Sequence, residues 1–274
     1  VHLTYNLIPT VKLARLYSRC KQLETAYWGE RRGRTRVERE MRKIADVQLN
    51  TSEGFFVQPI GAIESCYKQC IGTPRQGLLA PSSRSNLILT KNMSPESLDT
   101  LQEFSHVWIT FKFHLNTNTV KAKAFSGVQS DNKSYTFTGK ITPPMLKRKV
   151  GVLSTRSPHR PNPIGSVTLA RIDGIDKSKR MIMLSACDLV HGTPVLDIKP
   201  YVPFYDSIPD SFVAGWINET IQTRNNVTVL SQARLSLSKL VKKLYFYKNN
   251  EELFWGGVTE TLAADVRSEF QTRR

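Results

Sequence analysis

Four short segments hold most of the side chains in this sequence that could bind a ligand or do chemistry. Each is richer in arginine, histidine, asparagine or aspartate than strands and turns require. The segments are Thr73–Gly77 (TPRQG), Phe104–His114 (FSHVWITFKFH), Ser154–Gly165 (STRSPHRPNPIG) and Asp188–Tyr201 (DLVHGTPVLDIKPY). Binding residues concentrate on loops that a rigid scaffold positions, so these segments are the candidate site.

The third segment is the most informative of the four. Three prolines within six residues restrict its backbone, and it carries hydrogen-bond donors at Arg156, His159, Arg160 and Asn162. A rigid loop with so many donors contributes little to folding by itself. A binding role is therefore favoured over a merely elaborate turn.

The sequence excludes several common types of site. No two of the 15 glycines are separated by a single residue, so the Gly-x-Gly of the dinucleotide-binding fingerprint is absent. The P-loop and the Gly-x-Ser-x-Gly nucleophile motif are absent as well. Cys66 and Cys70 are separated by three residues rather than the two usual in zinc ribbons, and no second pair follows. We therefore expect no metal site, and the scattered cysteines suit a reducing compartment.

The chain is strongly basic, with 39 Lys+Arg against 23 Asp+Glu, a formal net charge of +16 and a pI of about 9.8. The excess is spread over the chain, as +5 in 1–57, +8 in 58–210 and +3 in 211–274. Such a charge fits either a solvated surface or nucleic-acid binding, because Lys and Arg release counterions from phosphates. No apolar stretch approaches the roughly 20 residues that a membrane span needs.

The elements that must position these segments differ along the chain. From Thr10 to Ile44, apolar residues at loose helical spacing amid charges predict one or two basic helices, with Gly29 and Gly33 as a break. A solvated helix and a partner- or RNA-binding arm are both consistent with this pattern. Residues 228–247 predict a helix whose apolar stripe packs inward, formed by Leu230, Leu237, Val241 and Leu244.

The pattern of apolar residues in the middle of the chain predicts short strands. In the clearest of them, Val107, Ile109, Phe111 and Phe113 share one face. Further strands are predicted at 55–63, 86–90, 135–141, 149–154, 166–172 and 181–186, with a helix beginning after Ser94 and an exposed insertion at 117–140. This density of strands predicts a mainly β barrel or sandwich with flanking helices, divided as 1–56, 57–210 and 211–274.

The four segments, in this order and at about this spacing, resemble the TrmO family of tRNA methyltransferases, also called the TsaA-like or YaeB family. The strings STRSPHRPNPIG and DLV-x-GTPV-x-DIKPY carry most of the resemblance. The resemblance implies a small β-barrel that binds S-adenosylmethionine (SAM) without a Rossmann fold and acts as a homodimer. It also implies N6-methylation of threonylcarbamoyl-adenosine next to the anticodon of tRNA. We expect a cytoplasmic location, with a nuclear or organellar one left open.

The family pattern also implies which residues bind the cofactor. These are Pro74, Arg75, Gln76, His114, Leu115, Arg156, Ser166, Ala186, Cys187, Asp188 and Leu189. Arg156 or Arg75 would bind the carboxylate of SAM, since a guanidinium matches a carboxylate in geometry and charge. His106 is expected to pack within its strand instead.

The remaining roles follow from chemistry and from the resemblance together. Asn162 and Asp188 are candidates to accept the proton that the methylated nitrogen loses, with Asp197 and Asp206 as alternatives, and Tyr201 or Tyr205 would stack on the base. Five basic residues would contact the phosphates of the tRNA backbone. They are Lys147, Arg148, Lys149, Arg160 and Lys199. A run of solvated surface charges is equally consistent with this pattern.

The region after the barrel departs from the family pattern, and two other functions remain open. The chain lacks the Asp-Pro-Arg motif that follows the barrel in the family pattern. We therefore expect either a chain cut short or tRNA contact through the basic N-terminal helices. The barrel would alternatively serve a non-catalytic RNA- or partner-binding protein, or the same SAM pocket would serve another methyl acceptor.

Overall fold

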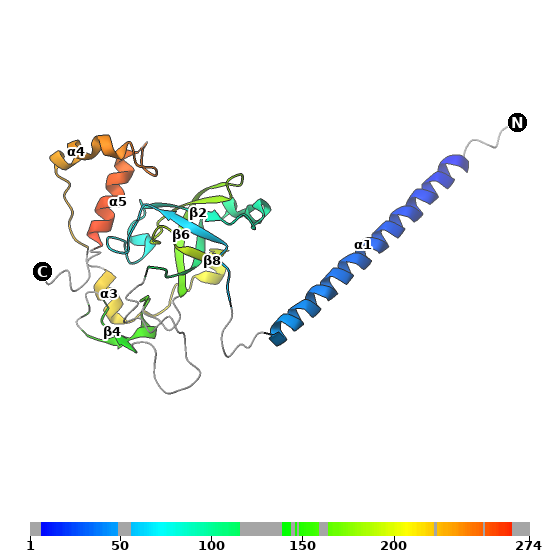
Figure 1. The fold of residues 1–274 in the computed structure, drawn as a ribbon, viewed down its shortest axis with the longest axis horizontal. Coiled ribbons are helices and arrows are strands. Elements are labelled where there is room, and N and C mark those ends of the chain that lie inside the picture. The colour runs from blue at the N-terminus through cyan, green and yellow to red at the C-terminus, as the bar shows by residue number, and fades with distance from the viewer. Residues whose placement is uncertain are drawn as a thin grey trace. The chain divides into compact units, whose positions relative to one another are not determined.

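A computed structural model describes residues 7–48, 56–115, 139–143, 146, 148–158, 164–221, 224–248 and 250–264 of the 274-residue chain. The chain divides into two compact units, Val1–Phe56 and Val57–Arg274. Each unit is described separately below (Figure 1).

The described part of the first unit contains one helix, α1 (Leu7–Gln48), which is 42 residues long and unbroken in Figure 1. The predicted break at Gly29 and Gly33 is wrong. A glycine inside a helix costs only about 1 kcal/mol relative to alanine, and the good helix formers around these two outweigh that penalty. The ion pair between Glu30 and Arg34 (2.8 Å), one helical turn apart, adds a small contribution.

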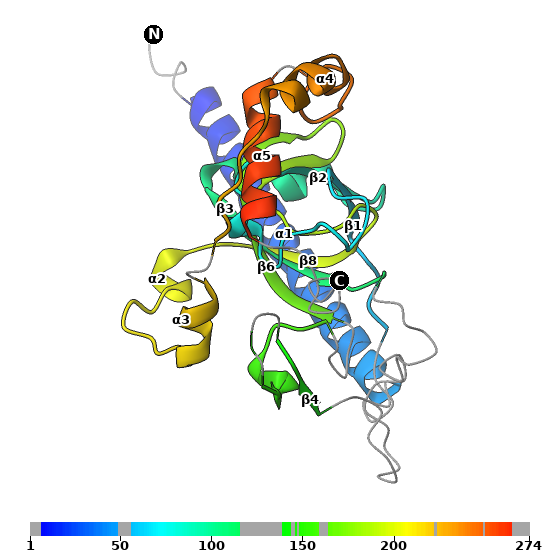
Figure 2. The ribbon, with the colours of Figure 1, turned by 90° about the vertical axis from the view of Figure 1, so that its left-hand side faces the viewer.

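The second unit is built on a closed barrel of six antiparallel strands, in the order β1-β2-β7-β6-β3-β8. This confirms the predicted mainly β barrel with helices at both ends (Figure 1, Figure 2). The strands are β1 (Gly61–Ser65), β2 (Arg84–Leu89), β3 (His106–Lys112), β6 (Ile164–Asp176), β7 (Met181–Ser185) and β8 (Pro194–Pro200).

Strand β3 confirms the predicted alternation, because Val107, Ile109 and Phe111 are buried in the core. Apolar residues at every second position of a strand lie on one face, and here that face fills the barrel. The pairing of β3 with β6 shifts register between Ile109 and Phe111, which pair with Thr168 and Gly165. The two intervening residues of β6 form a bulge beside the Ser154–Gly165 segment.

Some predicted strands have different limits in the structure. The strand expected at 55–63 begins at Gly61, and the stretch 149–154 contains β5 (Val150–Gly151) followed by a 3-10 helix, η5 (Val152–Ser154). Strand β5 pairs with β4 (Lys140–Ile141). Residues 135–138, and the predicted insertion from 117 to 138, lie outside the described residues.

Short helices lie between some of the strands and after the last strand. As predicted, Ser94 begins one, since its Oγ accepts a hydrogen bond from the Glu96 N–H (3.3 Å), and Leu98 is buried. The element is a single 3-10 turn rather than a long helix. The short helices are η1 (Gly77–Leu79), η2 (Pro95–Leu98), η3 (Leu101–Glu103), α2 (Pro203–Asp206) and α3 (Gly215–Ile221).

The C-terminal part contains α4 (Ser231–Val241) and α5 (Glu251–Ala263), which lie beside the barrel in Figure 2. The predicted helix at 228–247 is therefore shorter, and the predicted packing stripe is wrong at Leu230 and Leu244, which are exposed. The Glu260 carboxylate of α5 accepts hydrogen bonds from the N–H and the hydroxyl of Ser82, both at 2.7 Å. Within the described residues, no helix combines the length and apolarity of a membrane span.

Candidate functional site

The barrel brings two of the four polar segments into direct contact. Arg156 Nη1 donates a hydrogen bond of 2.5 Å to Gln76 Oε1, although the two residues are 80 positions apart in the chain. The Gln76 Nε2 in turn donates to the carbonyl of Arg75 (2.6 Å). This chain of hydrogen bonds orients the guanidinium of Arg156, whose side chain is exposed.

The Thr73–Gly77 segment also packs tightly against Ala186 and Cys187, which directly precede the fourth segment. A Cβ on Gly77 would lie 1.9 Å from the carbonyl oxygen of Ala186, so only glycine allows this approach. Ala186 has a left-handed backbone (φ 53°). The buried Ser83 fixes the next residue, since its Oγ accepts from Cys187 N (3.1 Å).

Asp188 lies at the centre of this arrangement and is partly buried. Burial raises the pKa of its carboxyl to about 6, although the Thr168 hydroxyl and the positive charge of Arg156 oppose that shift. The Thr168 Oγ1 donates to Asp188 Oδ1 at 2.5 Å. A carboxyl with this pKa changes charge close to neutral pH, as an acid-base group requires.

The backbone beside Thr168 is strained. Val167 has a φ of 74°, which is rare for a β-branched residue and costs of order 1–3 kcal/mol. Its place in the β6 bulge puts this strain next to the hydrogen bond between Thr168 and Asp188. Ser166 lies in the same bulge, but its side chain is outside the described residues.

His114 lies next to the fourth segment, and Leu115 lies next to Cys70 in the loop after β1. A Cβ on Gly192 would lie 3.6 Å from His114 Nε2, and burial lowers the pKa of His114, against a hydrogen bond with the backbone of His191. The imidazole is therefore neutral at neutral pH. The Cys70 Sγ donates to the Leu115 carbonyl at 3.9 Å.

Four of the predicted cofactor residues are buried, and Ala186 is one of them. Pro74 is buried in its loop, and the side chains of Cys187 and Leu189 belong to the hydrophobic core. Burial raises the pKa of the Cys187 thiol to about 12, so it remains protonated and unreactive. Any ligand contact at Cys187 and Leu189 would come from the backbone.

The alternative proton acceptors have other partners. Asp197 pairs with Lys199 (2.9 Å), and Asp206 accepts from the Val202 N–H (2.8 Å). Tyr201 makes an edge contact with Trp108 (5.7 Å between centroids), whereas Tyr205 is exposed beside Phe204. Asn162 lies outside the described residues.

The predicted RNA-binding group is only partly described. Arg148 and Lys149 are exposed, and Lys199 is exposed as well despite its ion pair with Asp197. Lys147 and Arg160 lie outside the described residues. Among the residues with described positions, no cluster of three or more His, Cys, Asp or Glu side chains is placed to hold a metal ion.

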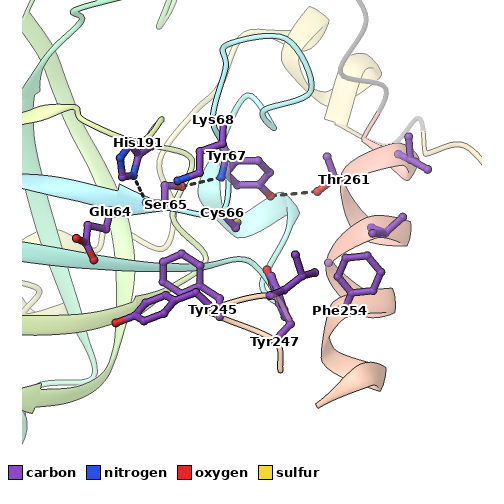
Figure 3. A pocket seen from close by; sticks show the side chains of 15 residues that line it. Glu64, Ser65, Cys66, Tyr67, Lys68, His191, Tyr245, Tyr247, Phe254 and Thr261 are labelled. Carbon is purple, nitrogen blue, oxygen red and sulfur yellow. Dashed lines mark hydrogen bonds between the residues drawn. The ribbon is translucent and has the colours of Figure 1, made fainter. Parts of the chain in front are cut away.

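A cavity that the sequence did not predict lies between β1, the loop after it, residues 244–247 and α5. Its volume is about 740 Å³. Figure 3 shows its polar and aromatic lining, which includes Glu64, Tyr67, Lys68, His191, Tyr245, Tyr247, Phe254 and Thr261. The Tyr67 hydroxyl bonds Thr261 (3.1 Å), which ties the loop after β1 to α5.

The cavity borders the candidate site. His191 lines the cavity, and its backbone interacts with His114. Cys66, also in the lining, lies close enough to Cys187 to affect the pKa of that thiol. The sequence signal that could have revealed this cavity is the aromatic cluster at 245–247 and 254–255, which the prediction of a single helix at 228–247 did not use.

The fold and the site together define a small, non-Rossmann β-barrel domain whose candidate ligand-binding loops meet beside one helical segment. The family described as the tRNA-methyltransferase O N-terminal domain matches residues 62–207, more than half of the chain. The chain therefore belongs to that family.

Similar proteins come from mammals and bacteria. A tRNA (adenine(37)-N6)-methyltransferase of Rattus norvegicus is 45% identical over 154 residues, which cover 55% of this chain and 31% of the relative. The Escherichia coli protein of the same name is 36% identical over 162 residues, covering 57% and 62%. The chain thus spans about a third of the length of its mammalian relatives.

Solved structures give the same result. The crystal structure of TrmO from Pseudomonas aeruginosa superposes with a TM-score of 0.58 at 32% identity, covering 78% of this chain and 81% of that one. The TrmO resemblance seen in the sequence is therefore confirmed.

Proposed function

We propose that this protein is a SAM-dependent tRNA methyltransferase that transfers a methyl group to N6 of the adenosine next to the anticodon, with threonylcarbamoyl-adenosine as the substrate. The observation that carries the proposal is the convergence of Gln76, Arg156 and Asp188 in a barrel of this family. Relatives at up to 46% identity are named tRNA (adenine(37)-N6)-methyltransferases.

The residues present fit SAM. The carboxylate of SAM would pair with the Arg156 guanidinium, which Gln76 already orients. Asp188 would face the positive end of the molecule or its ribose, and the backbone of residues 186–189 supplies polar groups for the adenine edge. When bound, SAM supplies an electrophilic methyl group.

The protein's own contribution is position and proton transfer. The new N–C bond forms as the C–S bond breaks in line, so the acceptor nitrogen must lose a proton. Asp188 accepts that proton, because a carboxylate with a pKa of about 6 is ionised at neutral pH and still basic. Asn162 would hold the amine through its amide oxygen.

The cavity of about 740 Å³ is the proposed site for the modified base. Bases taken out of a stacked strand are held between aromatic rings and by contacts to their edges. Tyr245 and Phe254 offer rings, and His191 lies between the cavity and the neighbourhood of His114.

The basic residues have a role in this proposal. Arg148, Lys149 and Lys199, with Lys147 and Arg160, contact the phosphates of the anticodon arm, and two copies of the barrel form a homodimer. The formal net charge of +16 supports a polyanionic partner.

Calorimetric titration with SAM tests the cofactor site. We expect Arg156→Ala to weaken SAM binding by about tenfold or more, because a charge-assisted hydrogen bond is worth roughly 1.5–3 kcal/mol. Arg171→Ala is the matched control, since Arg171 is an exposed arginine paired with Asp173 on β6. Equal SAM affinity of the unmodified protein and the Arg156→Ala variant would contradict the assignment.

A further inference from the structure

Helix α1 carries a strict repeat that the proposed function does not use. Positions spaced alternately by three and four residues run through most of the helix, and seven of these nine are apolar or cysteine: Leu13, Leu16, Cys20, Leu23, Tyr27, Glu30, Arg34, Val37 and Met41. Apolar residues every 3.5 positions are the signature of a coiled-coil seam.

Among the described residues of its own unit, the seam has no partner. Every side chain from Lys12 to Met41 is exposed, including Leu13 (69%) and Met41 (65%). Gly29 and Gly33 lower the intrinsic stability of the helix, and a Cβ at either position would have no atom within 4 Å. Long helices in proteins depend mainly on packing of an apolar face, so α1 requires a partner on this seam.

The two charged positions identify that partner. Glu30 and Arg34 lie on the seam on either side of position 32. In a parallel pair of identical helices each would meet its own copy, which buries like charges. In an antiparallel pair centred at position 32, Glu30 of each copy lies opposite Arg34 of the other.

We propose that α1 forms an antiparallel coiled coil with α1 of a second copy of this chain, centred at position 32. The same register places Tyr27 opposite Val37 and Leu23 opposite Met41 of the second copy. Every layer between positions 23 and 41 is then either apolar or a pair of opposite charges.

Charged residues that flank the seam favour neither orientation clearly, and their interactions are weaker than those in the seam. A parallel pair would bring Arg19 near Glu24 of the second copy, and an antiparallel pair brings Glu24 near Glu38. Exposed pairs of this kind contribute little, whereas an uncompensated charge in a seam is strongly unfavourable. The Glu30 and Arg34 layer therefore decides the orientation.

Sedimentation equilibrium of the full chain tests the proposal. Glu30→Arg and Arg34→Glu each place four like charges in the central layers, so each variant alone should associate about tenfold more weakly or worse. An equimolar mixture of the two restores opposite charges between copies but not within a helix, so association should return. Arg39→Glu, opposite the seam, is the matched control and should associate like the unmodified chain.

Three outcomes would overturn the proposal. One is unchanged association of both single variants, and another is a mixture that associates no better than its components. The third is an association of Arg39→Glu that is weakened as much as that of the two seam variants, which would show that the effect does not depend on the seam. A barrel-mediated dimer does not respond to these substitutions, so the two kinds of association remain distinguishable.

A disulfide experiment tests the orientation. Leu23→Cys and Met41→Cys, each in a Cys20→Ser background, should form a disulfide from residue 23 to residue 41 when mixed and oxidised, as mass spectrometry of the peptides would show. Predominant 23-to-23 and 41-to-41 disulfides would demonstrate parallel helices and overturn the proposal.

Discussion

At the scale of single residues, two aspartates show how the local environment sets acidity. Hydrogen bonds from the Ser178 hydroxyl and from the Lys179 backbone lower the pKa of the half-exposed Asp176 to about 2. Burial raises the pKa of Asp188 to about 6. The first is a fixed charge in a turn, whereas the second is suited to exchange a proton at neutral pH.

Asp188 makes the stability of the protein depend on pH. Its pKa in the folded state lies above the unfolded value of 3.8, so the folded state binds the proton more tightly and stability falls as pH rises from about 4 through about 6. The full effect is at most about 3 kcal/mol. Urea unfolding measures this effect. The free energy of unfolding should differ less between pH 4.5 and pH 7.5 in Asp188→Asn than in the unmodified protein.

The matched control for this experiment is Asp197→Asn, because Asp197 is an exposed aspartate paired with Lys199. It should keep the pH dependence of the unmodified protein. If Asp188→Asn keeps the full dependence too, Asp188 does not carry the proton.

Gly77 is the residue on which the site's geometry depends most directly. Gly77→Ala would place a Cβ 1.9 Å from a backbone oxygen, and such overpacking costs about 1–3 kcal/mol or more. We expect a lower midpoint of thermal unfolding and weaker SAM binding. Gly215→Ala, with no atom within 4 Å of its Cβ, should change neither, and equal behaviour of the two variants would refute the steric argument.

At the scale of elements, predictability from the sequence depended on how each element buries its residues. The alternation in β3 was predictable because one face is in the core and the other is not. Strand β8 was not predicted as a strand, since Asp197 and Lys199 face solvent and its buried positions are few. The break at Gly29 was predicted wrongly because isolated glycines weaken a helix without ending it.

The candidate site was predictable to a different degree. The spacing of proline and arginine in Ser154–Gly165 identified the loop as a candidate binding segment. The hydrogen bond between Arg156 and Gln76 was not predictable, because a sequence pattern does not show contacts between residues 80 positions apart. The raised pKa of Asp188 comes from burial, which no local pattern reveals. The cavity depends on α5, and α5 packs through Glu260 on Ser82.

Glu260 is the anchor that the cavity requires. Glu260→Ala removes both hydrogen bonds to Ser82 and leaves the backbone donor of Ser82 unpaired, which costs about 1–3 kcal/mol. Hydrogen exchange should become faster in α5 and at 80–83. Glu252→Ala, an exposed change in the same helix, should leave exchange unaltered. Unchanged exchange in both variants would show that α5 is held by other contacts.

At the scale of the whole molecule, the net charge of +16 leads us to expect that tRNA affinity depends on salt concentration. If Arg148 and Lys149 contact phosphates, tRNA affinity falls with salt and Arg148→Gln with Lys149→Gln reduces the slope of log affinity against log salt by about 1.4–1.8. Lys177→Gln with Lys179→Gln is the matched pair, and it should leave the slope unchanged. Equal slopes for both pairs would exclude phosphate contact by Arg148 and Lys149.

The barrel, the candidate cofactor loops and the cavity all support the central proposal, which is methyl transfer to tRNA. The most direct test is incubation of the full chain with methyl-labelled SAM and tRNA from cells lacking this protein, followed by nucleoside analysis. We expect the label on N6 of threonylcarbamoyl-adenosine, a loss of about tenfold or more in Arg156→Ala, and normal transfer in Arg171→Ala. SAM binding without any labelled nucleoside would contradict the account and leave a non-catalytic barrel.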